Sequence, residues 1–176
     1  MVPYTLTMSA EDNRTRPSLP NSQRDSAAYA LGLLRAISGA RGRGFTGLGV
    51  LFYRDLESFW YFQLVGRQAP PMQLPVVGSD AISHTLVAIS DVDSPWHDGF
   101  HFVDCRTRAL THLSQFVGLP RPPELDFPSS EWPSGARQAT ALLASRLPGI
   151  ECVGLIQGNG RLSVYANGSA RHEESP

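Results

Sequence analysis

Lysine is absent from this chain of 176 residues, and all 15 of its basic side chains are arginine. A P-loop lysine, a Schiff-base lysine and a lysine nucleophile are therefore excluded. An excess of basic charge is also missing, because 16 acidic side chains bring the formal net charge to -1. Binding to nucleic acid through phosphate neutralisation needs a clear basic excess. The composition therefore argues against strong nucleic-acid binding.

Cysteine is scarce, and long apolar runs are missing. The two cysteines, Cys105 and Cys152, form no Cys-x-x-Cys pair and are too few for a disulfide framework. No apolar stretch approaches the roughly 18–20 residues that a membrane span requires. The start of the chain also lacks the basic-then-apolar layout of a secretory signal. We therefore expect a cytoplasmic protein in a reducing compartment, with no membrane partner.

The apolar content is sufficient for one domain. Apolar residues make up 41% of the chain, which supports a buried core at a length typical of a single domain. Residues 1–22 are mostly polar and include prolines, which predicts a flexible N-terminal arm. The polar residues 169–176 are predicted to form a disordered tail. The folded domain is expected to span residues 23–168.

Alternating helical and strand patterns predict an α/β fold with a mixed central β-sheet flanked by helices. Helices are predicted over residues 24–38, 80–90 and 134–147. Strands are predicted over residues 47–53, 58–65, 100–103, 109–113, 152–156 and 162–165. The first two strands are expected to form a hairpin, and so are the last two, around Gly158-Asn-Gly160. The proline-rich segments 68–78 and 118–133 are expected to be loops.

The densest group of chemically useful residues is Ser94-Pro-Trp-His-Asp-Gly-Phe-His101. Asp98 followed by Gly99 at a strand start puts a carboxylate at the rim of a sheet, where it can bind a divalent cation or accept a proton. His97 and His101 are four positions apart, so on an extended strand they point away from the side of Asp98. One metal ion bound by all three side chains therefore needs a bulge or turn between them. The alternative is a turn followed by an amphipathic strand with half-exposed histidines.

A second candidate site opens the helix predicted over 134–147, where the sequence is Ser134-Gly-Ala-Arg-Gln-Ala-Thr140. Free backbone N–H groups at a helix start, together with the Arg137 guanidinium, can bind a phosphate. The alternative is an ordinary helix start with a solvated arginine. The aromatic residues 60–62 are interpreted as sheet core and not as a base-stacking surface.

The order of these segments carries a more specific pattern. A predicted helix leads into His97-Asp-Gly-Phe100, a strand and turn lead to Leu119-Pro120, Gly135-Ala-Arg-Gln-Ala-Thr-Ala-Leu142 opens the next helix, and Leu162-Ser-Val164 follows a glycine turn. This order resembles the diadenylate cyclase domain, the catalytic fold of the bacterial enzymes that make cyclic di-AMP. The resemblance covers residues 43–168 and implies a single α/β domain with a nucleotide site.

Two of the family's functional positions are kept in this chain. Asp98 stands where the aspartate of the family's Asp-Gly-Ala motif acts with a metal ion on the ribose 3′-hydroxyl. Arg137 stands in the phosphate-gripping Thr-Arg-His-Arg motif. The other positions carry different residues, namely Ala136, Gln138, Ala139 and the pair Ile156-Gln157. Trp96 and Phe100 stand where the family has leucine and alanine, and rings filling the pocket would favour a purely structural role.

The resemblance implies a catalytically degenerate domain that senses ATP, a cyclic dinucleotide or another small ligand in bacterial signalling. Its ligand would contact His97, Asp98, Gly99, Gly135 and Arg137, and Mg²⁺ or Mn²⁺ would bind at Asp98. The alternative is a divergent metal-dependent nucleotidyltransferase in which Asp98 is catalytic. Family members place two nucleotide sites face to face, which implies self-association. The signal would pass to a separate effector protein.

Overall fold

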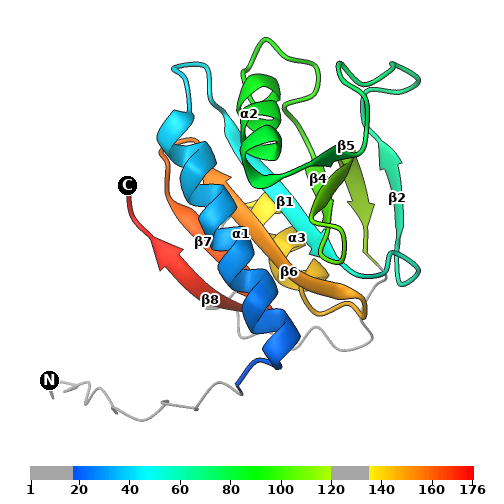
Figure 1. The fold of residues 1–176 in the computed structure, drawn as a ribbon, viewed down its shortest axis with the longest axis vertical. Helices are drawn as coiled ribbons and strands as arrows, with labels where there is room; N and C mark the ends of the chain where they lie inside the picture. Colours follow the sequence, from blue (N-terminus) through cyan, green and yellow to red (C-terminus); the bar gives the residue numbers. More distant parts are fainter. Residues whose placement is uncertain (1–17, 120–134) are drawn as a thin grey trace, which may run out of the picture.

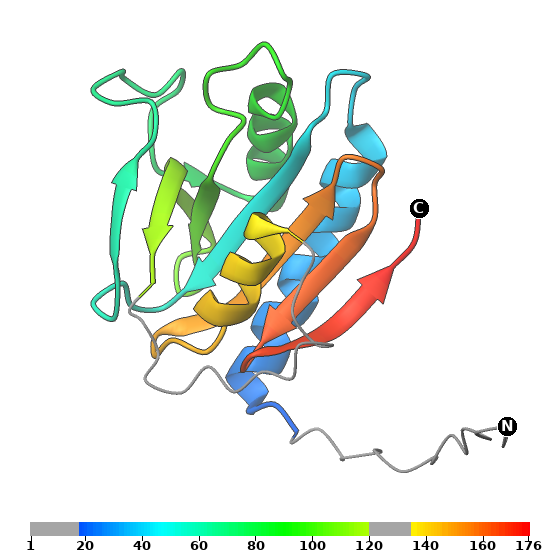
Figure 2. The same ribbon diagram turned by 180° about the vertical axis from the view of Figure 1, so that it is seen from behind.

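Within residues 18–119 and 135–176, which the computed structural model describes, eight strands form one mixed β-sheet. Helices α1 and α2 lie on one face of the sheet and α3 on the other (Figures 1 and 2). The strand order is β2-β5-β4-β1-β6-β7-β8, and β3 also pairs with β5. The elements are α1 (Asn21–Ala40), β1 (Gly47–Tyr53), β2 (Trp60–Gln63), β3 (Val76–Val77), α2 (Ser79–Ile89), β4 (Phe100–Asp104), β5 (Ala109–Gly118), α3 (Ala136–Ala144), β6 (Ile150–Gln157), β7 (Leu162–Ala166) and β8 (Ser169–Glu174). The predicted fold class is confirmed.

Strand β1 lies at the centre of the sheet. It pairs in parallel with β4 and antiparallel with β6. All of its residues but the last are buried, because α1 covers one face of the sheet and α3 covers the other. A strand covered on both faces carries a continuous apolar run rather than an alternating one, as β1 does. The predicted strand over 47–53 is confirmed.

Helix α1 packs against the sheet through one apolar side. Leu34 and Ile37 are fully buried on that side. Gly154 of β6 provides the space for this contact, since a Cβ on Gly154 would lie 2.6 Å from Cδ1 of Leu34. The helix begins at Asn21, so the end of the predicted N-terminal arm is helical and the predicted start at residue 24 was too late. Residues 18–20 of that arm precede the helix without regular structure, and residues 1–17 lie outside the described residues.

The predicted hairpin between the first two strands is wrong. β1 is flanked by β4 and β6, whereas β2 pairs with β5 at the edge of the sheet. The strand places beside β1 are filled by β4 in parallel and by β6 in antiparallel pairing, which leaves no place for β2. The second hairpin is confirmed, because β6 and β7 pair antiparallel around a turn closed by the Gly160 N–H donating to the Gln157 carbonyl at 2.8 Å. The loop predicted over 118–133 lies mostly outside the described residues.

The predicted disordered tail is also wrong. Residues 169–174 form β8, an edge strand that pairs antiparallel with β7. The Arg35 guanidinium of α1 donates hydrogen bonds to the Glu174 carboxylate and ties the end of this strand to the helix. An edge strand needs little apolar sequence, because its outer side faces solvent. Polarity therefore gave no warning that this segment is a strand.

Candidate functional site

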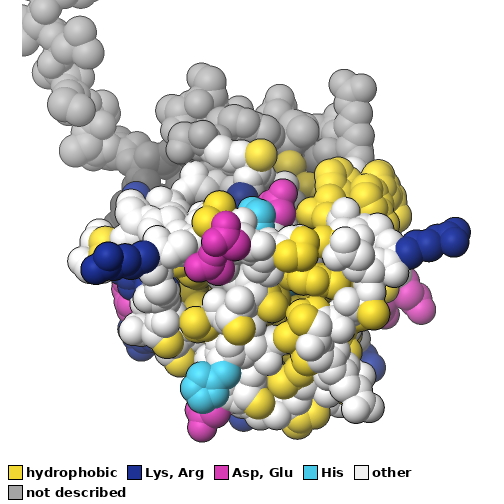
Figure 3. Space-filling model, turned by 90° about the horizontal axis from the view of Figure 1, so that it is seen from above, with side chains coloured by type: hydrophobic (Ala, Val, Ile, Leu, Met, Phe, Trp, Pro, Cys, Tyr) yellow, Lys and Arg dark blue, Asp and Glu magenta, His cyan; other side chains and the backbone are white. Residues whose placement is uncertain are grey.

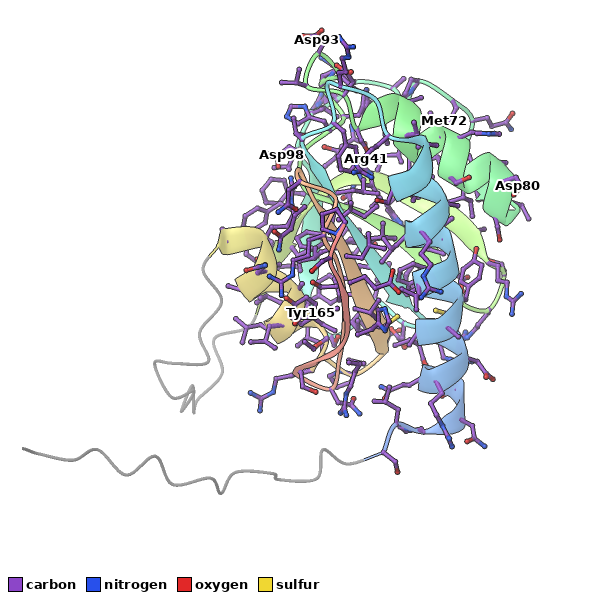
Figure 4. All side chains as sticks on the ribbon, turned by 90° about the vertical axis from the view of Figure 1, so that its left-hand side faces the viewer. Arg41, Met72, Asp80, Asp93, Asp98 and Tyr165 are labelled. Carbon is purple, nitrogen blue, oxygen red and sulfur yellow. The ribbon has the colours of Figure 1, made fainter. Side chains whose placement is uncertain are left out.

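The carboxylate of Asp98 and the guanidinium of Arg137 meet although they lie 39 positions apart in the chain. Nη2 of Arg137 donates to Oδ1 of Asp98 at 3.2 Å, with side chains 30% and 69% exposed respectively. Asp98 immediately precedes Gly99 and β4, and Arg137 lies in the first turn of α3. Figure 4 shows Asp98 near the upper end of the sheet. The two candidate sites of the sequence are therefore one site.

The start of α3 adds backbone donors to this site. Gly135 is the N-cap residue of the helix, and it has no side chain of its own with which to cap the N–H groups of the first turn. These groups have no acceptor within the helix, and the helix dipole places partial positive charge among them. Gly135 therefore lies at the helix start, as the sequence predicts, two residues before Arg137. Backbone donors and a cation at one helix start favour an anionic ligand.

Gly47 is a residue of the candidate site that the sequence interpretation missed. It begins β1 with φ +110°, and a Cβ there would lie 3.1 Å from Nη1 of Arg137 and 2.9 Å from the Ile156 carbonyl oxygen. The missing side chain therefore lets the Arg137 guanidinium lie against the start of β1. A glycine at the first position of an otherwise apolar strand was the available signal, since glycine there marks a close approach.

The turn before β4 positions Asp98. The Gly99 N–H donates to Oδ1 of Asp98 at 2.7 Å. Gly99 has φ +78°, and a Cβ on it would lie 2.7 Å from both the Gln115 carbonyl oxygen and Cδ1 of Leu64, so no other residue fits without movement. His97 turns its Nδ1 onto the Ser94 carbonyl at 2.5 Å. That bond keeps the imidazole within its own turn, beside Asp98 in sequence but not hydrogen-bonded to it.

His101 differs from the other candidate residues in being fully buried. β5 bulges opposite this residue, since Phe100 pairs with Gln115 but Phe102 pairs with His112. Ser114 in the bulge has φ +52°, and its N–H donates to Nδ1 of His101 at 3.2 Å. The side chain is fully buried, and its Nε2 has no hydrogen-bond partner among the residues that the structure describes. His101 therefore completes the hydrogen bonding of a bulge, a role that strand periodicity alone does not reveal.

His101 stays neutral in the native protein. Burial, and secondarily the charge of Arg137, lower the pKa of His101 to about 3. Only the unfolded chain takes up a proton on this residue between about pH 6.5 and 3, so stability falls as pH falls through that window. This group alone contributes a slope of up to about 1.4 kcal/mol per pH unit.

A series of urea unfolding curves from neutral to acidic pH measures this effect. We expect His101→Gln to reduce the acid sensitivity, because the glutamine side-chain oxygen can accept the Ser114 N–H without titrating. Equal pH dependence in the two proteins would show that His101 is not the group that titrates on unfolding.

The two rings that replace smaller residues of the family lie in the core. Trp96 is 4% exposed and Phe100 is 5% exposed. Phe100 covers Gly49 of β1, where a Cβ would lie 2.7 Å from Cδ1 of the ring, and it belongs to the cluster of buried side chains beneath α3. The ring therefore fills the sheet-to-helix layer behind Asp98.

Asp98 offers one carboxylate, which fits a divalent cation only when a bound ligand supplies further oxygen atoms. In the described part of the chain, no group of three or more His, Cys, Asp or Glu side chains is placed to hold a metal ion. Mg²⁺ is commonly held by one or two carboxylates together with substrate phosphates and water. Asp98 can supply one such carboxylate, and a nucleotide would supply the phosphate oxygens. The three-ligand arrangement of His97, Asp98 and His101 is not formed.

The likeness of this chain to known proteins lies in its fold. No family model and no curated protein matches the sequence. The fold, an α/β domain with a mixed sheet, resembles that of DacA from Staphylococcus aureus, a diadenylate cyclase solved as a double mutant. That match has a TM-score of 0.50 and 16% identity, and it covers 86% of this chain and 90% of DacA.

A hypothetical membrane-spanning protein from Bacillus cereus also shares the fold. The TM-score is 0.54 at 16% identity, over 86% of this chain and 64% of the other. The present chain therefore spans about two thirds of the length of that protein. Among the described residues of this chain, no helix has the length and hydropathy needed to cross a bilayer. At 16% identity these likenesses concern the fold alone.

Proposed function

We propose that this chain is a nucleotide-binding sensor domain with a diadenylate cyclase-like fold and without cyclase activity. The observation that carries the proposal is the meeting of Arg137 and Asp98 at 3.2 Å beside the start of α3. A guanidinium and several backbone N–H groups can bind the phosphates of ATP or of a cyclic dinucleotide. Asp98 can then bind a Mg²⁺ or Mn²⁺ ion that the same phosphates coordinate.

Catalysis is disfavoured because most of the family's phosphate-binding side chains are replaced. Each charge-assisted hydrogen bond to a phosphate contributes about 1.5–3 kcal/mol. Loss of an arginine, a histidine and a threonine hydroxyl removes on the order of 4–6 kcal/mol, or three to four decades in rate. Binding needs less stabilisation than the transition state does. A domain that binds without turnover would pass its signal to a separate effector protein, and we expect both in the cytoplasm.

Calorimetric titration with ATP and cyclic di-AMP, with and without Mg²⁺, tests the proposed function directly. The sensor proposal predicts binding of at least one of these nucleotides with no product formed. Absence of heat with every nucleotide, in both the presence and absence of metal, would overturn it.

Asp98→Asn separates the sensor from the alternative nucleotidyltransferase. In the free protein the Asp98 carboxylate occupies the Arg137 guanidinium that the phosphate needs. Exposed ion pairs contribute about 0.2–1 kcal/mol, so we expect metal-free nucleotide affinity to rise by up to about fivefold in the variant. The added benefit of Mg²⁺ should disappear, because its carboxylate ligand is gone.

Asp93→Asn is the matched control, since Asp93 is an exposed aspartate in the same loop and Figure 4 shows it apart from Asp98. It should leave affinity and metal dependence unchanged. A linear or cyclic nucleotide product formed by the unmodified protein and lost in Asp98→Asn would instead establish the nucleotidyltransferase.

A further inference from the structure

Three pairs of an aspartate or asparagine followed by glycine occur in the sequence, namely Asp98-Gly99, Asn159-Gly160 and Asn167-Gly168. In such a pair the glycine nitrogen can attack the side-chain carbon Cγ of the residue before it, because glycine has no Cβ to obstruct the approach. The first residue of each pair is exposed to solvent. Exposure therefore does not distinguish the three pairs, and the hydrogen bonds of the reacting groups must do so.

The Asn159-Gly160 pair turns its two reacting groups away from each other. The Gly160 N–H donates to the Gln157 carbonyl at 2.8 Å. Oδ1 of Asn159 accepts a hydrogen bond from the Arg161 N–H at 3.0 Å. Both hydrogen bonds belong to the turn between β6 and β7, so the attack would first have to open that turn.

The Asn167-Gly168 pair, in the turn between β7 and β8, is held in the same way. The Gly168 N–H donates to Oγ of Ser145 at 3.1 Å. Oδ1 of Asn167 accepts a hydrogen bond from Nε2 of Gln23 at 3.1 Å. The glycine nitrogen is therefore bonded to the end of α3, while the asparagine side chain is bonded to α1.

The Asp98-Gly99 pair has the opposite arrangement. The Gly99 N–H donates to Oδ1 of Asp98 itself at 2.7 Å, so the nitrogen lies beside the carboxyl group that it would attack. The Asp98 side chain is 69% exposed, and water can reach it. Figure 4 places Asp98 at the upper end of the molecule, and the view from above shows acidic side chains at the surface there (Figure 3). Contact between two reacting groups raises the rate of the reaction between them.

We propose that Asp98 isomerises spontaneously to isoaspartate in the folded protein. The Gly99 nitrogen bonds to Cγ of Asp98, and the bond from Cγ to one carboxylate oxygen breaks. That oxygen leaves as water, with the N–H proton and one proton from solvent, and a succinimide ring remains. Water then adds to the backbone carbonyl carbon of Asp98, and the bond from that carbon to the Gly99 nitrogen breaks. The chain now runs through Cγ, and the former backbone carbonyl carbon is the free carboxylate.

The isomerisation changes the turn before β4. Cβ of Asp98 becomes a main-chain atom, which lengthens the turn, and the free carboxylate is attached to Cα and no longer to Cβ. We expect the isomerised protein to lose the ion pair between Asp98 and Arg137. The reaction depends on the geometry of this turn and not on nucleotide binding, so it stands or falls separately from the proposed function.

Asp98→Asn allows a direct comparison, because it puts an Asn-Gly pair at all three places in the chain. Deamidation of asparagine follows the same ring closure with ammonia as the leaving group, and peptide mass spectrometry measures it at each place. In the folded variant we expect position 98 to deamidate at least about tenfold faster than Asn159 and Asn167, since only there are the reacting groups in contact. In urea the three rates should become similar, because the hydrogen bonds that separate them are lost.

The unmodified protein is incubated in buffer, and its isoaspartate is labelled by an isoaspartate methyltransferase and located by peptide mapping. We expect label at position 98, and Asp98→Glu should abolish it there because its longer side chain does not form the succinimide. Asp93→Glu is the matched control and should leave the label unchanged, and circular dichroism confirms the fold of each variant. No label at position 98, a folded Asp98→Asn variant in which position 98 is no faster than the other two, or the same ratio of rates in urea would overturn the proposal.

Discussion

Replacing Arg137 with alanine is expected to lower nucleotide affinity by about ten- to a hundredfold, because charge-assisted hydrogen bonds to phosphate contribute about 1.5–3 kcal/mol. The guanidinium is held between Asp98 and the start of β1, where Gly47 leaves room for it. The helix N–H groups remain in the variant but bind phosphate weakly on their own. Calorimetry with the best nucleotide of the panel measures the effect.

Arg35→Ala is the matched control for this experiment. Arg35 is an exposed arginine on α1 that also forms an ion pair, with Glu174. It lies on a different element and should leave nucleotide affinity unchanged. Equal losses in the two variants would indicate a general effect of positive charge and would contradict a site at Arg137.

Phe100→Ala is expected to destabilise the fold by about 3–5 kcal/mol, the usual cost of removing a buried aromatic ring from a core. The ring covers Gly49 and lies in the layer between the sheet and α3. Glycine at position 49 cannot fill the space that the ring leaves. Urea unfolding monitored by circular dichroism measures the loss.

Phe116→Ala provides the comparison, because Phe116 is 42% exposed and should lose less than half as much stability. If Phe100→Ala retained full stability and bound nucleotide more tightly, the ring would be a block to a ligand site and not a core residue. That outcome would also indicate that the alanine found in the family at the position of Phe100 leaves room for the nucleotide base.

The sequence predicts the parts of this molecule in which local pattern and final environment agree. Leu34 and Ile37 fall on one side of a helix, and the apolar run of β1 matches a strand covered on both faces. Asp98 and Arg137 were identified by their residue types and their places at a strand start and a helix start. Their contact depends on the strand order, and only the resemblance to a known family implied that the two residues share a site.

The remaining features depend on long-range geometry that local sequence does not encode. β8 is polar because its outer side faces solvent, so its sequence resembles a tail. Gly47 is needed because Arg137 arrives from a distant helix. His101 is buried because β5 bulges opposite it, and the bulge is set by pairing between strands. Trp60 and Phe62 are exposed because β2 lies at the sheet edge and not beside β1.

The most direct test of the site is a nucleotide titration of isotope-labelled protein followed by NMR. We expect ATP or cyclic di-AMP to shift the signals of the backbone amides of Asp98, Gly99 and Gly135 together with that of the side-chain Nε of Arg137. Signals from α1 and β8 should stay in place. Saturable shifts confined to other elements, with the Arg137 side chain unmoved, would contradict a phosphate site where the carboxylate and the guanidinium meet.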